Sequence, residues 1–277
     1  YFEKTWPLRL KKTAFDMFNV FRFLGKLQFG NALKTFCRAV GFFFLPRIYW
    51  CLPEIMRMEE KYGYKSTLHF YGRPRSARRG FKLWLFDPSY DVQKDQFEGN
   101  ALSVAIRDLK EGGWRIGLHQ SFDSWFDAGK MKEEKSFVEG AAGALIERCR
   151  QHWLKFSWEE TWKAQQNAGF KLDATLGFND RPGFRNSTAL LYHPWDETSG
   201  PMSILSLPTV FMDSHFWDYD SHSDTERLSV LKRWVDEVIA VGGEASVIWH
   251  QRVYHEDYGW GDLYEALLRY MNEKNVN

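Results

Sequence analysis

Several hydrophobic runs in this sequence end in side chains that can bind metal ions or transfer protons. The pattern is seen in the runs WRIGLH, RCRQHWL, KLDATLG, LPTVFMD and EASVIWH. The polar residues at or near their ends are His119, Arg150, His152, Asp173, Asp213 and His250. Neutral imidazole is a common ligand of divalent metals, and histidine also transfers protons near neutral pH. The set therefore indicates a metal site or acid–base chemistry.

Each of these residues also has a purely structural interpretation. A single histidine at the end of a strand is more often a hydrogen-bonded part of the scaffold than a ligand, and Arg150 would form a structural ion pair with Asp173. Three histidines in one set are harder to explain by packing alone. These residues by themselves leave both roles open for His119, metal ligand and hydrogen-bonded scaffold.

Helix-like segments alternate with the strand-like runs from about Glu54 onward. Helical periodicity followed by glycine is seen in PEIMRMEEKYG, NALSVAIRDLKEGG and SDTERLSVLKRWVDEVIAVGG. In a further segment, Ser157 with Glu160 three residues later predicts a capping box. Connections of helix length imply parallel strands, so a single-layer barrel and an open doubly wound sheet both fit. The carboxyl ends of such strands share one rim, where the polar residues would meet.

Two features of the connecting segments bear on function. No glycine-rich phosphate loop follows any strand-like run, which argues against a dinucleotide or nucleoside-triphosphate site. The stretch from Asn179 to Pro201 is rich in Pro, Gly, Asn and Ser. We expect it to form a long loop that acts as a lid or as one wall of a cleft.

The first part of the chain is basic and aromatic. Between Arg9 and Arg47 there are eight Lys or Arg residues and one acidic residue, Asp16. We expect residues 1–53 to form a helical insertion, packed on a barrel of residues 54–277, with its lysines in water. Contact of residues 9–47 with a membrane surface or an acidic polymer is the alternative. The most apolar run is interrupted by Pro46 and Arg47, and it is too short to span a bilayer.

The composition limits the compartment and the partners. The chain has 277 residues, 44% of them hydrophobic, which suits one large domain. Its net charge of +1 gives no global attraction to nucleic acid, and we expect no nucleic-acid partner. Three scattered cysteines favour neither a disulfide framework nor a cysteine-based zinc site. We therefore expect a cytoplasmic protein, with a periplasmic or membrane-peripheral location as the alternative.

Six segments, taken in order, resemble the bacterial polysaccharide deacetylase superfamily, in its branch with GLHPSY-like and RQHYL-like motifs. They are IGLHQSFDS, RQHWLKFSWEETW, AGFKLDATLGFND, GFRNSTALLYHPWD, LPTVFMD and VIWH. The resemblance implies a distorted barrel of seven or eight parallel strands with outer helices. It also implies hydrolysis of N- or O-acetyl groups on sugars with the help of a divalent metal, with zinc expected and nickel or cobalt as alternatives.

The resemblance further implies individual roles. His119 takes the position of the first metal-binding histidine, and His250 that of the general acid. Arg150 corresponds to the arginine that orients the catalytic base, and Asp173 is the candidate for the acid beside it. The second histidine of the motif is replaced by Asp123, a carboxylate that can still bind zinc. His152 is the alternative second ligand, and we favour it because imidazole binds zinc more commonly.

One motif of the superfamily is missing from the expected place. The catalytic aspartate pair should lie on the first strand, ahead of the segment with His119. Asp87 and Asp91, in LFDPSYDV, come too late in the order. We expect the pair to be encoded just before Tyr1.

Aromatic and polar side chains near the motifs are candidates for sugar binding, because an aromatic face covers the apolar face of a pyranose. They are Trp153, Arg185, His193, Trp195, Asp196 and Asp213. The expected function is therefore that of a metal-dependent deacetylase-like hydrolase in the biosynthesis of a surface polysaccharide or lipopolysaccharide. A catalytically silent barrel that binds a carbohydrate or a partner protein is one alternative. A glycosidase with Asp173 and Asp213 as paired carboxylates is another.

Overall fold

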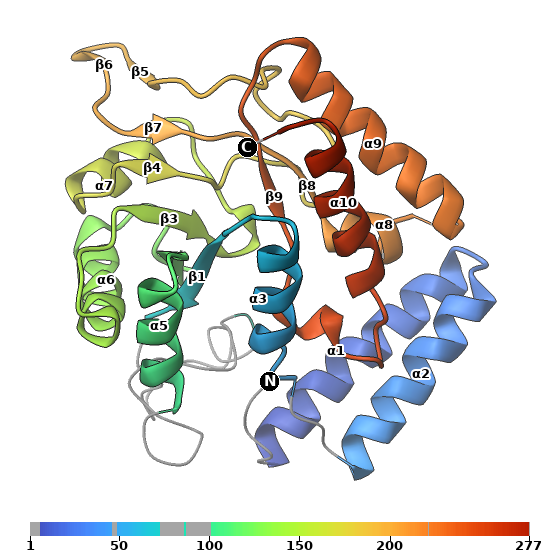
Figure 1. Ribbon diagram of the computed structural model, residues 1–277. Coiled ribbons are helices and arrows are strands. Elements are labelled where there is room, and N and C mark those ends of the chain that lie inside the picture. The colour runs from blue at the N-terminus through green and yellow to red at the C-terminus, as the bar shows by residue number, and fades with distance from the viewer. Residues whose placement is uncertain (1–5, 46–48, 73–85, 87–100, 221, 277) are drawn as a thin grey trace.

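Parallel strands lie inside the molecule and helices cover them, as Figure 1 shows for the computed structural model. The structure describes residues 6–45, 49–72, 86, 101–220 and 222–276. In these ranges one parallel sheet has the order β1-β2-β3-β4-β7, and β8 pairs in parallel with β9. The bounds are β1 Thr67–Tyr71, β2 Arg115–Gln120, β3 Arg148–Gln151, β4 Leu172–Asp173, β7 Leu205–Ser206, β8 Thr209–Met212 and β9 Ser246–Ile248. The predicted α/β class with parallel strands and outer helices is confirmed.

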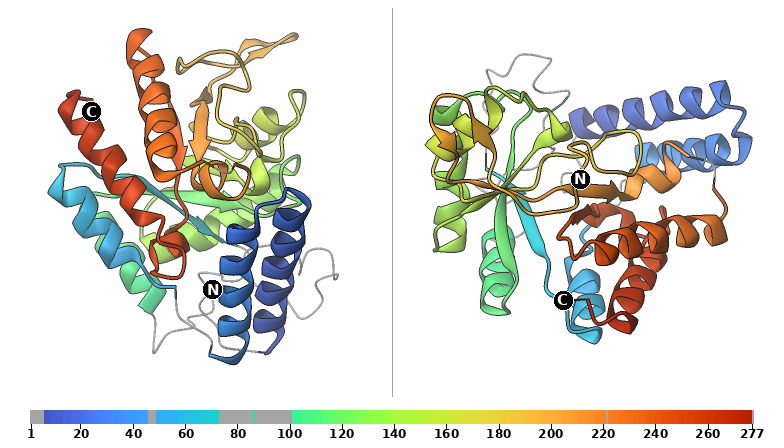
Figure 2. Two further views of the ribbon diagram at one scale, coloured as in Figure 1. Left: turned by 90° about the vertical axis from the view of Figure 1, so that its right-hand side faces the viewer. Right: turned by 90° about the horizontal axis from the view of Figure 1, so that it is seen from above.

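The helices pack on the outer face of these strands (Figure 2). One group covers the larger sheet: α5 (Ala101–Glu111), α6 (Ala128–Ala142) and α7 (Thr161–Asn167). A second group covers β8 and β9: α8 (Asp213–Trp217), α9 (Asp224–Ala240) and α10 (Gly261–Glu273). Helix α3 (Leu52–Lys61) precedes β1, and the 3-10 turns η1 (His152–Leu154) and η2 (Gln251–Tyr254) follow β3 and β9.

Two apolar clusters lie between strands and helices. Leu118 of β2 packs with Met131 of α6 and Trp162 of α7 in the first cluster. Phe211 of β8 packs with Leu267 of α10 in the second. These side chains point from the strands toward the covering helices. Because successive side chains of a strand alternate in direction, their neighbours point to the opposite, inner face.

The register of the parallel strands determines which side chains share the inner face. Residues paired across parallel strands point to the same side of the sheet. His119 pairs with Arg150, so both belong to one face, and Leu118 pairs with Cys149 on the other. Since Leu118 and Cys149 lie in the cluster under the helices, His119 and Arg150 are on the inner face.

Carboxylates fix two of the connections around the strands. Asp127 caps α6 by accepting from the backbone N–H groups of Gly129 and Lys130 at 3.0 and 3.1 Å. Glu134 of the same helix accepts from the backbone N–H of Ser121 at 3.0 Å, and so holds the chain just after β2. A carboxylate near the start of a helix is favourable because the helix dipole is positive there.

The predicted capping box at the start of α7 is wrong. The helix begins at Thr161 with Glu160 at the N-cap position, and no side chain caps it. Instead, the backbone N–H of Ser157 donates to the Thr161 hydroxyl at 2.9 Å. A capping box does occur on α9, where Ser223 and Glu226 bind each other's backbone N–H.

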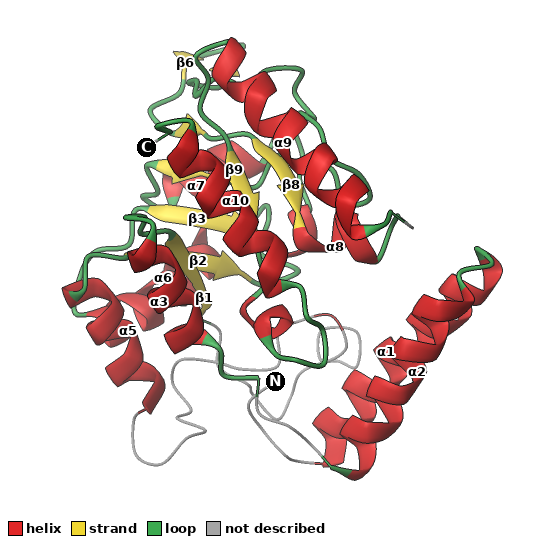
Figure 3. Cartoon of the chain, turned by 45° about the vertical axis from the view of Figure 1, so that its right-hand side comes forward, coloured by secondary structure: helices red, strands yellow, loops and turns green. Residues whose placement is uncertain are grey.

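An N-terminal helical hairpin lies on one flank of the fold, where α1 (Trp6–Gly25) and α2 (Phe29–Phe44) run side by side (Figure 3). Arg22 of α1 donates to the carbonyl of Asp218 at 2.9 Å and so ties the hairpin to the end of α8. The expectation that the lysines of this segment face water is wrong for Lys11 and Lys12, which are 5% and 1% exposed. Lys12 is instead 2.5 Å from Asp16 inside the packed face of the hairpin.

No helix within the described ranges combines the length and the apolar character needed to cross a bilayer.

The predicted long loop contains a short antiparallel pair, β5 (Trp195–Asp196) and β6 (Gly200–Pro201). Lys163 of α7 holds this pair through an ion pair of 2.5 Å with Asp196. The loop is therefore fastened to α7 along part of its length.

We predict that Gly117→Ala destabilises the protein, because an added Cβ would lie 2.6 Å from Cδ2 of the His69 ring. The expected loss in the free energy of unfolding is about 1–3 kcal/mol, measured by urea denaturation. Gly140→Ala on α6 is the matched control, since its Cβ meets no atom within 4 Å. The control should be neutral or stabilising by up to about 1 kcal/mol. Equal effects of the two substitutions would contradict this packing.

Candidate functional site

Two imidazoles from adjacent strands meet at the carboxyl ends of β2 and β3. His119 Nε2 lies 2.6 Å from Nδ1 of His152, and the two rings are nearly perpendicular, at 84°. The other ring nitrogen of His152, Nε2, is 2.7 Å from the carbonyl oxygen of Phe86. A carbonyl only accepts, so His152 carries its proton on Nε2 and presents a lone pair on Nδ1 toward His119.

The environment keeps both imidazoles neutral. Burial lowers the pKa of His119 well below its ordinary value, and the charges of His152, His69, His250 and Arg150 act in the same direction. Burial likewise lowers the pKa of His152 to about 3, against the opposing hydrogen bond to Phe86. The charge of His250 contributes to lowering the pKa of both His119 and His152.

The donor chemistry of the pair fits a divalent cation. Neutral imidazole is the form that ligates metals, and a hydrogen bond from the second ring nitrogen typically fixes the ligand's tautomer. In this protein the Phe86 carbonyl provides that second contact for His152. If His119 takes the tautomer with its proton on Nδ1, its Nε2 also presents a lone pair, and a cation bound to both nitrogens would replace the hydrogen bond between them.

Asp123 does not join the two histidines. Its Oδ1 accepts from the Ser121 hydroxyl at 3.1 Å, and its Oδ2 lies 3.2 Å from Nζ of Lys130. Across the described part of the chain, three metal-binding side chains with ligand atoms within 4.8 Å of one another occur once, at His255, Glu256 and Asp257. Of the two alternatives for the second ligand, the structure thus brings His152 next to His119. Asp87 and Asp91 lie outside the described residues.

His250 is held by a buried carboxylate at the end of the neighbouring strand. Its Nδ1 lies 2.9 and 3.0 Å from the two carboxylate oxygens of Asp213, which also accepts its backbone N–H at 2.6 Å. Burial by itself would raise the pKa of Asp213, but the charge and hydrogen bonds of His250 outweigh it and lower that pKa. The ionised carboxylate fixes the Nδ1–H tautomer of His250 and leaves its Nε2 free to exchange a proton.

The position of Asp213 does not support the sugar-binding role expected for it. Its side chain is fully buried, whereas that of His250 is 37% exposed. A carboxylate with no exposed surface orients the imidazole and does not reach a substrate. The glycosidase alternative loses support for the same reason, because it requires Asp213 at the substrate.

Arg150 occupies the inner face beside His119. Its Nε donates to the carbonyl of Ala174 at 3.0 Å, and its Nη2 donates to the hydroxyl of Ser246 on β9. These contacts cross from the larger sheet to the smaller one. The guanidinium is thus fixed near the two imidazoles, and its charge helps to keep His119 neutral.

Asp173 is on the other face of the sheet from Arg150. It pairs in register with Cys149, and its carboxylate accepts from Gln165 at 2.9 Å and from Trp162 at 3.2 Å, both on α7. Burial raises its pKa to about 6, against the opposing hydrogen bonds. The structure shows no ion pair between the described side chains of Arg150 and Asp173. This position does not support the expected role of Asp173 as the acid beside a catalytic base.

Trp153 lies at the rim directly after His152. The residue is 49% exposed, and its ring packs edge-on against that of Phe86, with ring centroids 5.4 Å apart. Trp153 and Leu154 have φ of +59° and +48°, a left-handed backbone that bulky residues rarely adopt. Such strain is retained where the surrounding structure enforces it, often at functional sites. Arg185 is close by, since its Nη1 lies 3.4 Å from the Leu154 carbonyl.

His193 and Trp195 lie at the opposite end of the strands. The chain around Tyr192 runs antiparallel to β7 and pairs with Ser206. His193 Nδ1 is 3.2 Å from the carbonyl of Ile204, which precedes β7. The following hairpin thus extends from the amino end of β7, away from the rim that carries His119. This position does not support the expected role of either residue in binding substrate.

Two contacts of the site carry no signal in the sequence. Glu134 of α6 holds Ser121, and the backbone carbonyl of Phe86 accepts a hydrogen bond from His152. Neither residue belongs to a motif, and a backbone carbonyl leaves no trace in side-chain types.

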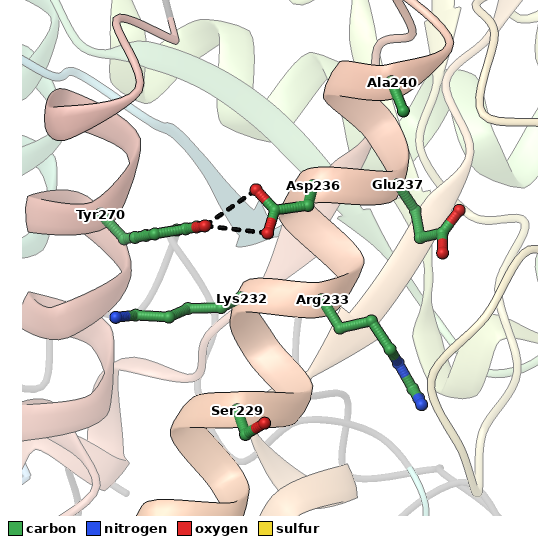
Figure 4. Close-up of a pocket in the computed structure, with 7 residues that line it drawn as sticks. All are labelled: Ser229, Lys232, Arg233, Asp236, Glu237, Ala240 and Tyr270. Carbon is green, nitrogen blue, oxygen red and sulfur yellow. Dashed lines mark hydrogen bonds between the residues drawn. The ribbon is translucent and has the colours of Figure 1, made fainter.

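A shallow hollow lies between α9 and α10, apart from the site described above (Figure 4). Its lining, which includes Lys232, Asp236 and Tyr270, contains none of the predicted site residues.

Comparison with known proteins supports the fold. No protein-family model matches the chain, and no curated protein sequence matches it. A candidate polysaccharide deacetylase from Mycobacterium smegmatis has a similar structure, with a TM-score of 0.55 and 14% identity over 94% of this chain and 80% of that one. Identity this low supports a shared fold alone.

Two more distant structures also align. Puue allantoinase has a TM-score of 0.41 at 18% identity, over 62% of this chain and 57% of its own. A GH57 branching enzyme from Thermococcus kodakaraensis has a TM-score of 0.41 at 11% identity, over 64% of this chain and 48% of its own. Similarity at this level carries no argument about function.

We predict that the stability of the metal-free protein falls as the pH drops below about 6.5, partly because His152 must stay neutral. Its folded pKa of about 3 is lower than its unfolded value, so its contribution is present above the unfolded pKa and lost as the pH falls. In His152→Gln, the loss of stability between about pH 7.5 and pH 5 should be smaller by about 2 kcal/mol. Urea denaturation of both proteins, in a metal chelator, measures this difference.

The raised pKa of Asp173 does not disturb this comparison. Because that pKa is raised to about 6, the contribution of Asp173 to stability grows as the pH falls, opposite to that of His152. It is the same in both proteins and cancels in the difference. Identical pH dependence in wild type and His152→Gln would show that His152 is not held neutral.

Proposed function

We propose that this chain is a metal-dependent deacetylase-like hydrolase acting on N- or O-acetylated sugars of a surface polysaccharide or lipopolysaccharide. The observation that carries the proposal is the contact of 2.6 Å between His119 Nε2 and His152 Nδ1. His250, held by Asp213, is a further imidazole whose charge acts on both. The resemblance of the motifs and the shared fold with a candidate polysaccharide deacetylase support it.

The reaction needs help with both reactants. An acetamide carbonyl is a poor electrophile, and water is a poor nucleophile at neutral pH. A divalent ion, zinc first and nickel or cobalt as alternatives, would lower the pKa of a bound water and polarise the carbonyl. His119 and His152 would hold the ion with their neutral nitrogens, and burial prepares both for that role.

His250 would complete the reaction by protonating the leaving amine or alcohol. Asp213 holds its Nδ1, so Nε2 is the nitrogen that exchanges the proton. Arg150 keeps positive charge beside the imidazoles and thereby favours developing negative charge on a substrate oxygen. The exposed face of Trp153 is suited to stacking on a sugar ring, with Arg185 at its side.

A second candidate function is a catalytically silent barrel that binds a carbohydrate or a partner. The specific observation in its favour is that, among the described residues, no third metal-binding side chain has a ligand atom within 4.8 Å of those of His119 and His152. A catalytic zinc site normally has three protein ligands. Metal content and acetate release separate the two candidates.

We predict that the full-length protein retains stoichiometric zinc, nickel or cobalt after dialysis, and that His119→Ala and His152→Ala each lose it. Removing one of two imidazole ligands should weaken binding by about 100-fold or more. Elemental analysis and competition with a chromogenic chelator measure this. His193→Ala is the matched control, because this histidine lies at the other end of the strands. Retention of the metal by all three variants would exclude the pair as its site.

We predict that His250→Ala lowers kcat for acetate release from acetylated oligosaccharides by about 10²–10⁴-fold, with little change in KM. Asp213→Asn should lower kcat less and shift the pH profile, because it acts through His250. Metal content should be the same in both variants as in wild type. An unchanged kcat in His250→Ala would remove it from the mechanism. Bound metal without acetate release would favour the silent barrel, and release of reducing ends would favour a glycosidase.

A further inference from the structure

The outward faces of the N-terminal hairpin, residues 6–45, are apolar. Of the large hydrophobic side chains exposed in the described part of the chain, twelve belong to this hairpin and nine are scattered over the rest. Their exposed fractions range from 38% to 75%. They are Trp6, Leu10, Phe18, Phe21, Leu24, Leu27, Phe29, Leu33, Phe36, Val40, Phe44 and Leu45. A cluster of this size on a protein surface marks an interaction site.

The spacing places these side chains on one stripe of each helix. On α1, Leu10, Phe18 and Phe21 are separated by steps that keep a residue on the same helical face. The opposite face of α1 packs on the protein and includes Lys12 and Asp16. The hairpin therefore buries charged groups beside its apolar contacts and, unlike an ordinary surface helix, exposes many large apolar side chains.

The charge of the hairpin is of one sign. Between Arg9 and Arg47 the sole acidic residue is Asp16, which is buried and paired with Lys12 and Arg38. Lys26 and Lys34 are exposed. From Arg9 to Arg47, the surface thus combines large apolar side chains with lysines and has no exposed carboxylate.

We propose that this face docks on the surface of a lipid bilayer that contains anionic lipids. The apolar stripes enter the boundary between head groups and acyl chains, and Lys34 contacts the head groups. Lys26 adds positive charge at the turn of the hairpin, where its Nζ donates to the carbonyl of Tyr219 at 3.0 Å. A second copy of the chain fits this face less well, because two positively charged hairpins would meet without a carboxylate between them. The helices lie on the bilayer and do not span it.

Docking would place the candidate site beside the bilayer. The hairpin is tied to two segments near His250: Arg22 binds the Asp218 carbonyl, and Arg38 lies 4.0 Å from the ring centroid of Tyr258. Both segments follow the strand ends that carry Asp213 and His250. A bilayer held by the hairpin would therefore lie near the rim of the strands.

The experiment is flotation of the full chain with two kinds of vesicle, neutral phosphatidylcholine and phosphatidylcholine mixed with phosphatidylglycerol. The wild-type protein should float with the anionic vesicles, and less so at high salt. Phe18→Glu with Phe21→Glu should weaken binding by about tenfold or more, because two inserted rings are lost. Leu145→Glu with Val241→Glu is the matched control, since these side chains are 80% and 58% exposed elsewhere.

A charge variant tests whether the lysines of the hairpin contribute to binding of anionic vesicles. Lys34→Glu should weaken binding to anionic vesicles by roughly fivefold, whereas Lys132→Glu, at an exposed position on α6, should not. No flotation of the wild type, or equal flotation of Phe18→Glu/Phe21→Glu, would overturn the proposal. A dimer in sedimentation equilibrium that this double variant dissociates, without vesicle binding, would show that a second copy covers the face. The test needs neither metal nor substrate, so its outcome is independent of the proposed activity.

Discussion

The parallel register between β2 and β3 is the constraint on which the candidate site depends. It pairs His119 with Arg150 and so places His152, two residues further on, beside His119. A shift of one residue in this register would turn His119 toward the helices, because successive side chains of a strand alternate in direction. The buried Leu118 and Cys149 on the opposite face prevent such a shift, since it would expose them. The apolar core thereby determines the position of the polar site.

Two histidines at the carboxyl ends of the strands, His152 and His250, are each held in one tautomer by a hydrogen-bond partner. The Phe86 carbonyl sets the tautomer of His152, and the Asp213 carboxylate sets that of His250. Glu134 holds the chain immediately after His119 through Ser121. Burial makes these contacts effective, because a buried polar group without a partner is costly. The same burial keeps the imidazoles neutral, which is the state that both metal binding and proton transfer from a tautomer require.

The placement of several candidate residues could be predicted from the sequence, because hydrophobic runs mark parallel strands and the ends of such strands meet at one rim. In this way the sequence predicts the strand-end positions of His119, His152 and His250, and the structure brings His119 into contact with His152 and His250 into contact with Asp213. Their functional roles stay predictions. The prediction for Asp173 is not supported because β4 is two residues long, too short to show which side faces the helices. His193 and Trp195 lie elsewhere because the chain pairs antiparallel with β7 through backbone contacts. The burial of Lys12 was missed because one aspartate, Asp16, four residues further on, compensates its charge inside a packed face.

The central claim is that His119 and His152 hold one divalent ion through the two nitrogens that face each other. Anomalous diffraction from crystals of the full-length protein grown with zinc, recorded at the zinc absorption edge, tests it most directly. The account predicts a peak bonded to Nε2 of His119 and Nδ1 of His152, about 2.0–2.1 Å from each. A peak at His255, Glu256 and Asp257 instead, or no peak between the two imidazoles, would contradict it.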